Sequence, residues 1–203
     1  MKITTVAALA GLALCSTVAQ AEIVILQGPG NVAGDENVLF NGTGLIDTGV
    51  LVQGRTNQSS SIVNFFDAGT ILTTPGNGQA RIEAQTGTFG ALSIALNEPL
   101  STYTSLILNI NAAADGQVTF NIGDVSDGSV LSQTFDVDKS GQNFFRIVAS
   151  GDSRINLTSL TTTVGIQDIK QVRLGGAQAV PEPTTLAGIG VAALALLRRK
   201  KKA

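Results

Sequence analysis

Residues 106–122, with the sequence LILNINAAADGQVTFNI, decide the fold class. Apolar residues fill the even positions of 106–111 and again of 118–122, while most of the odd positions are polar. A period of two is typical of half-buried β-strands, because successive side chains of a strand point to opposite faces of the sheet. Asp115-Gly116 between the two runs is a turn signal. The stretch therefore predicts two strands separated by a turn.

The same pattern of short strands and turn residues continues on both sides of this stretch. No window of 22–180 has sustained apolar spacing at i, i+3, i+4 and i+7, so no helix is expected there. Turn signals of the Asn-Gly and Asp-Gly kind recur between the runs. Further strands are expected at 23–26, 50–53, 62–66, 70–73, 81–84, 92–96, 131–137, 144–149, 155–163 and 169–174.

About a dozen short strands with Gly-rich turns predict an all-β domain over residues 22–177. The expected architecture is a single antiparallel β-sandwich, jelly-roll-like and similar to galactose-binding or carbohydrate-binding modules. Its core is expected to contain Ile, Leu and Val together with all eight Phe residues.

The composition disfavours most catalytic chemistry. The chain of 203 residues has no His and no Trp, and a single Cys that cannot form an intrachain disulfide. A glycosidase would need paired carboxylates, yet 22–180 contains only four Glu, and most of its Asp residues lie beside Gly at expected turns. We therefore expect a protein that is not an enzyme.

Charge is unevenly distributed along the chain. The whole chain has a net charge of −2, but residues 22–180 hold 14 acidic and seven basic residues, a net charge of −7. An acidic domain argues against nucleic acid and against an anionic membrane surface as partners.

The N-terminus has the features of a secretory signal peptide over residues 1–21. Met1-Lys2 is followed by a largely apolar stretch at 3–15, and Ala19 and Ala21 form an A-x-A site with cleavage expected after Ala21. The alternatives are a buried first helix and a lipoprotein signal at Cys15, which the large Leu14 disfavours.

The C-terminus has three parts in a fixed order. Residues 178–185 form an expected linker that contains the rigid, extended step Pro181-Glu182-Pro183. Residues 186–197 are uncharged and apolar, and a helix over 184–197 would span about 21 Å, against about 30 Å for a bilayer core. The tail 198–203, with Arg198, Arg199, Lys200, Lys201 and Lys202, is expected in the cytoplasm.

Pro-Glu-Pro, a short apolar segment and a terminal basic cluster in this order resemble the PEP-CTERM sorting signal of exported proteins in Gram-negative bacteria. The resemblance covers about the last 24 residues, from Val180 onward, and implies an exosortase in the inner membrane as the partner that recognises and processes the tail. The alternative is a plain tail anchor with an incidental Pro-Glu-Pro.

One short segment has the spacing of calcium ligands. Asp136, Asp138 and Ser140 precede Gly141, as in the first half of an EF-hand loop, but the twelfth position is Ile147 rather than Glu. Because Asp and Gly are also ordinary hairpin residues, a plain turn is the alternative. No other cofactor is expected.

These patterns predict a non-enzymatic protein that is exported, held transiently in the inner membrane by its tail, and then placed at the cell surface or in the extracellular matrix of a biofilm. The alternative is a surface carbohydrate-binding or adhesin module, calcium-assisted or not, with extracellular polysaccharide as its partner. The lack of Trp and the single Tyr103 weaken the alternative, since sugar faces stack on exposed aromatic rings.

Overall fold

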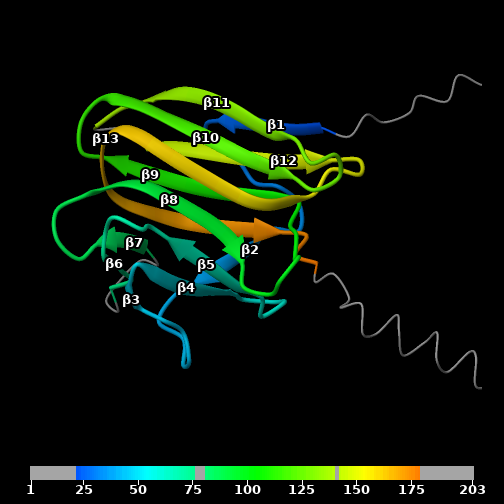
Figure 1. Cartoon of the computed structure of the whole chain (residues 1–203), viewed down its shortest axis with the longest axis horizontal. Coiled ribbons are helices and arrows are strands. Elements are labelled where there is room, and N and C mark those ends of the chain that lie inside the picture. The colour runs from blue at the N-terminus through cyan, green and yellow to red at the C-terminus, as the bar shows by residue number, and fades with distance from the viewer. Residues whose placement is uncertain (1–21, 76–80, 140–141, 179–203) are drawn as a thin grey trace, which may run out of the picture.

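The computed structural model describes residues 22–75, 81–139 and 142–178 (Figure 1). These residues form strands and no helix, and every strand pairing is antiparallel, which confirms the predicted all-β antiparallel class. The strands are β1 (Glu22–Gln27), β2 (Glu36–Leu39), β3 (Thr48–Gly49), β4 (Leu51–Thr56), β5 (Ile62–Phe66), β6 (Leu72–Thr73), β7 (Arg81–Ala84), β8 (Phe89–Leu96), β9 (Ser105–Ala112), β10 (Gly116–Asp124), β11 (Val130–Val137), β12 (Asn143–Ser150) and β13 (Ile155–Gly175).

Strand β13 has 21 residues and belongs to both layers of the molecule. Its first part pairs with β10 and β8, and its second part pairs with β9, β7 and β2. Figure 1 shows the yellow half of β13 beside β10 and the orange half in the layer behind. The pairings β13–β8, β8–β5, β5–β4, β4–β2 and β2–β13 close a ring. The two layers are therefore joined by hydrogen bonds.

The structure corrects the prediction of two separate strands at 155–163 and 169–174. Gly165 and Asp168 in the intervening segment have the composition of a turn, yet the chain stays extended through it. An added Cβ at Gly165 would meet the side chain of Thr88, so the glycine here permits a close approach. Two short strands, β2 and β3, were not predicted.

The core lies between the two layers, and the even positions of 106–111 and 118–122 all belong to it, as predicted. Phe120 on β10 and Phe145 on β12 meet across the layers with ring centroids 4.9 Å apart. The prediction that all eight Phe residues line the core is wrong for two of them. Phe66 is 44% exposed, and Phe144 is half-buried on the opposite face of β12 from Phe145. Strand alternation places adjacent side chains on opposite faces, so a Phe-Phe pair puts one ring outside.

Tyr103 is fully buried, and its hydroxyl donates a hydrogen bond of 2.7 Å to Oγ1 of Thr158. The one tyrosine is thus unavailable for stacking on a sugar at the surface.

Several predicted segments lie outside the described residues: the signal peptide at 1–21, the linker from 179 onward, the apolar segment at 186–197 and the basic tail at 198–203. Within the described residues, the structure has no helix that is long and apolar enough to cross a membrane.

Candidate functional site

The residues predicted to direct sorting and cleavage are not among the described residues. They are Ala19, Ala21, Pro181, Glu182, Pro183, Arg198, Arg199, Lys200, Lys201 and Lys202. The described chain ends at an isolated bridge in which the N–H groups of Thr102 and Gln178 each donate to the carbonyl of the other residue, at 2.9 and 2.8 Å. The β-domain is therefore hydrogen-bonded up to Gln178.

The predicted calcium ligands lie at the end of β11. Oδ1 of Asp136 accepts a hydrogen bond of 3.1 Å from Nε2 of Gln117 on β10. The N–H of Asp138 donates to Oδ1 of Asn143, and Nδ2 of Asn143 donates back to the carbonyl of Asp138. This reciprocal contact is how a side-chain amide closes a turn. Ser140 is outside the described residues, and the described residues contain no group of three or more His, Cys, Asp or Glu that could hold a metal ion.

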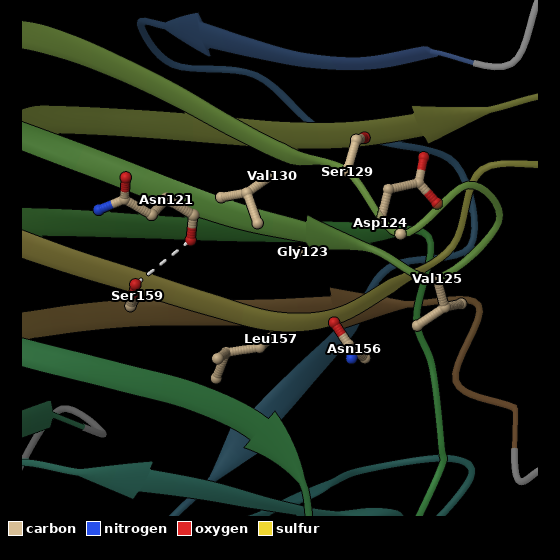
Figure 2. A pocket seen from close by; sticks show the side chains of 10 residues that line it. Asn121, Gly123, Asp124, Val125, Ser129, Val130, Asn156, Leu157 and Ser159 are labelled. Carbon is tan, nitrogen blue, oxygen red and sulfur yellow. Dashed lines mark hydrogen bonds between the residues drawn. The ribbon is translucent and has the colours of Figure 1, made fainter.

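A groove of about 450 Å³ lies over the end of β10 and the start of β13 (Figure 2). Figure 2 shows Val125 from the β10–β11 connection, Val130 from the start of β11 and Leu157 from β13 around it. These three side chains are 46%, 66% and 41% exposed, so they form an apolar rim. Polar lining comes from residues such as Asn121 and Ser159, which a hydrogen bond joins.

Gly123 forms part of the groove floor because Asn156 lies across it. A Cβ added at Gly123 would be 2.6 Å from Oδ1 of Asn156, which is closer than non-bonded atoms approach. The backbone of β10 therefore has no side chain at this point, and the amide of Asn156 occupies the space that a side chain would take.

Asp124 is the one ionisable residue in the groove lining, and it holds the neighbouring connections together. Its Oδ1 accepts hydrogen bonds from the N–H and hydroxyl of Ser126 and from the N–H of Arg154, at 2.7–3.1 Å. Burial raises the pKa of the Asp124 carboxyl, but the hydrogen bonds that it accepts outweigh this effect and hold the pKa below its ordinary value. An ionised carboxylate with these donors already bound is poorly suited to act as a general acid or base.

No local pattern in the sequence indicates this groove. The Asp-x-x-Asp-Gly spacing of 124–128 indicates a turn, but nothing local places it beside the start of β13. Apart from the Asp124 carboxylate, the groove lining consists of aliphatic, amide and hydroxyl groups and backbone.

A protein-family model for the PEP-CTERM protein-sorting motif matches residues 179–202, which confirms the resemblance that the C-terminal sequence predicted. The motif marks an exported protein that is processed at the membrane. No curated protein sequence matches the chain.

Several solved structures have a distant likeness to the fold. A mutant of a carbohydrate binding module of family 29 shares 15% identity over 78% of this chain and 90% of its own, with a TM-score of 0.36. CBM29_1, a family 29 carbohydrate binding module from Piromyces equi, shares 12% identity over 76% and 89%, with a TM-score of 0.31. Likenesses this distant say nothing about what the present chain binds.

Proposed function

We propose, starting from the PEP-CTERM protein-sorting motif at residues 179–202, that an exosortase processes this chain at the inner membrane and that the β-domain then serves as a non-enzymatic component of the cell surface or extracellular matrix. The motif match is the observation that carries the proposal. In the groove, Oδ1 of Asp124 already accepts three hydrogen bonds, from Ser126 and Arg154. This supports the proposal that the domain does not perform acid–base chemistry.

The order of residues in the tail suggests how processing proceeds. Residues 186–197 enter the bilayer, and the five basic residues at 198–202 halt the chain, since a Lys or Arg at the bilayer centre costs about 3 kcal/mol. The Pro-Glu-Pro step then stays outside the membrane. Its two prolines keep it extended, which a protease requires of its substrate, and Glu182 supplies a charge for recognition by a basic pocket.

The β-domain is held close to the motif by the Thr102–Gln178 bridge. Only two residues separate Gln178 from Pro181, so Pro181 lies within about 11 Å of Gln178 even if the chain between them is fully extended. The enzyme that cleaves there must accommodate the folded domain beside its active site.

The test is mass spectrometry of the mature C-terminus in strains with and without exosortase. With the enzyme, the surface protein should lack the basic tail, and without it the full chain ending at Ala203 should remain in the membrane. Glu182→Ala should leave an unprocessed precursor in the membrane, and deletion of 198–202 should leave one that is partly mislocalised.

Glu98→Ala is the matched control, because Glu98 is an exposed acidic residue of the β-domain, outside the motif. It should be processed as the wild type is. Surface protein with an intact Ala203 in both strains would refute sorting and favour a simple anchor.

A further inference from the structure

The side of β7, β9, β12 and β13 that faces away from the core carries a dense set of polar side chains, which we call the outer polar face. Strand register brings these residues together from four separate parts of the chain. Its polar members are Arg81, Glu83, Asn109, Asn111, Arg146, Asp168, Lys170 and Arg173, and the apolar Ile107 and Phe144 lie among them.

Two cross-strand rows define the centre of this face. In the first row Phe144 pairs with Asn109, Asn109 with Lys170, and Lys170 with Arg81. In the second row Nδ2 of Asn111 donates a hydrogen bond of 2.8 Å to Oδ2 of Asp168. Directly opposed residues have Cβ atoms about 5 Å apart, so each row is a continuous strip of neighbouring side chains.

Asn109 at the centre of the face has no hydrogen-bond partner for its side chain among the described residues. The residue is 1% exposed, and neither Nδ2 nor Oδ1 is bonded. Nε of Arg146 is likewise buried without a hydrogen bond within the described chain, and so is Oδ1 of Asp168, which has Nζ of Lys170 at 4.0 Å. Buried polar groups in native proteins nearly always have partners. Their concentration on one face points to a ligand that supplies donors and acceptors there.

The face also concentrates positive charge in an acidic domain. Four of the seven basic residues of the domain lie on it: Arg81, Arg146, Lys170 and Arg173. Only Glu83, Asp168 and the adjacent Asp35 oppose them, whereas the rest of the domain has eleven acidic and three basic residues. An anionic ligand would be attracted to this face and repelled elsewhere.

One end of the face is closed and the other is open. The segment after β1 covers the closed end, where Nη1 of Arg173 donates to Oδ1 of Asn31 at 2.6 Å, and a Cβ on Gly30 would lie 2.5 Å from Nη1 of Arg146. At the open end Nε of Arg81 pairs with Oε2 of Glu83 at 2.8 Å, and Nζ of Lys170 lies 4.0 Å from Oδ1 of Asp168. The side chains of Arg81 and Lys170 are still 39% and 28% exposed. A ligand would therefore reach Asn109 from the side of these two residues.

We infer that the outer polar face binds a polysaccharide whose sugar rings carry carboxylates. Lys170 and Arg81 would pair with the carboxylates. The amides of Asn109 and Asn111 would bond ring hydroxyls, since an amide both donates and accepts. The half-buried ring of Phe144 would cover the apolar C–H side of a sugar. The inference rests on the proposed function in that the domain meets such a polymer only once it is exported.

Calorimetric titration of the purified full chain with oligogalacturonate tests the inference and does not depend on exosortase. Binding should be about tenfold weaker in Lys170→Ala, the loss expected for one charge-assisted contact. Lys139→Ala, which removes an exposed lysine from the β11–β12 connection, should bind as the wild type does. Neutral dextran should not bind.

Asn109→Leu separates a binding role from a structural one. Because the asparagine amide is buried without a bond, a leucine of similar size should leave the melting temperature unchanged or raise it, while oligogalacturonate binding is lost. Wild-type binding by Asn109→Leu would overturn the inference. Equal weakening by Lys139→Ala and Lys170→Ala, equal binding of dextran, or tighter binding of duplex DNA would also overturn it.

Discussion

At the residue scale, Asp124 joins the β10–β11 connection to the start of β13 through hydrogen bonds to Ser126 and Arg154. Asp124→Ala should destabilise the protein by about 2 kcal/mol at pH 7, because the bonded N–H donors lose a charged acceptor. Asp127→Ala in the same turn is the control. Within the described chain, Oδ1 of exposed Asp127 accepts only from the N–H of Ser129. Asp127→Ala should therefore lower the free energy of unfolding by less than Asp124→Ala does.

The same carboxylate predicts a pH dependence. Its pKa is lowered in the folded state, so the ionised form stabilises the fold above the unfolded value of about 3.9, and this contribution is lost as the pH falls through the native pKa. Urea unfolding from pH 7 to pH 3 should show the difference between wild type and Asp124→Ala shrinking below about pH 4. A difference that stays constant down to pH 3 would contradict this account.

Tyr103 and Thr158 form a buried pair whose two members depend on each other. Burial raises the pKa of the Tyr103 phenol, so its hydroxyl remains a donor to Thr158. Tyr103→Phe should cost about 1–2 kcal/mol, because it leaves the fully buried Thr158 hydroxyl without this partner. In a double-mutant cycle, Thr158→Val should destabilise the Tyr103→Phe variant less than it destabilises the wild type. Additive losses in urea unfolding would show that the two hydroxyls are not coupled.

At the element scale, β13 depends on an irregularity at Gln171. The register with β9 shifts between Lys170 and Arg173, and Gln171 has a φ of 55°. In a regular strand, residues 170 and 173 would point to opposite faces. The extra residue places both on the outer polar face, while Val172 and Leu174 stay buried.

Replacing the bulge residue by glycine should therefore stabilise the protein. Gln171→Gly relieves the cost of a left-handed conformation, about 1 kcal/mol for a residue with a side chain. Gln167→Gly is the matched control, because Gln167 lies in the same strand without a positive φ. This variant should lose about 0.5–1 kcal/mol of folding stability. Guanidinium unfolding of both variants gives the comparison. A loss of stability in Gln171→Gly would show that its side chain contributes more than its backbone strain costs.

At the scale of the whole molecule, the sharing of β13 between the layers should make unfolding cooperative. Among the strands that the structure describes, β13 bonds to five others, whereas β3 bonds only to the two-residue β6. We expect the slowest amide hydrogen exchange in β9 and both halves of β13, and the fastest in β3 and β6. Mass spectrometry of exchanged peptides measures this. Different exchange free energies for the two halves of β13 would show that the layers open separately.

Local patterns were sufficient for two conclusions about this protein. The alternation in 106–122 predicted the all-β class, because the period of a strand is a property of neighbouring residues. The order of Pro-Glu-Pro, apolar segment and basic cluster predicted the sorting motif that the family model matches, since such a signal is contiguous in sequence.

Only the tertiary structure decided which side chains meet. The row that joins Phe144, Asn109, Lys170 and Arg81 depends on pairings between four strands, and a one-residue slip in any of them would turn its side chain to the other face. The burial of Tyr103 and the exposure of Phe66 depend in the same way on which face of each strand the opposite layer covers. The candidate binding face could not be found from the sequence because register and bulges arise from long-range packing, and neighbouring residues do not specify them.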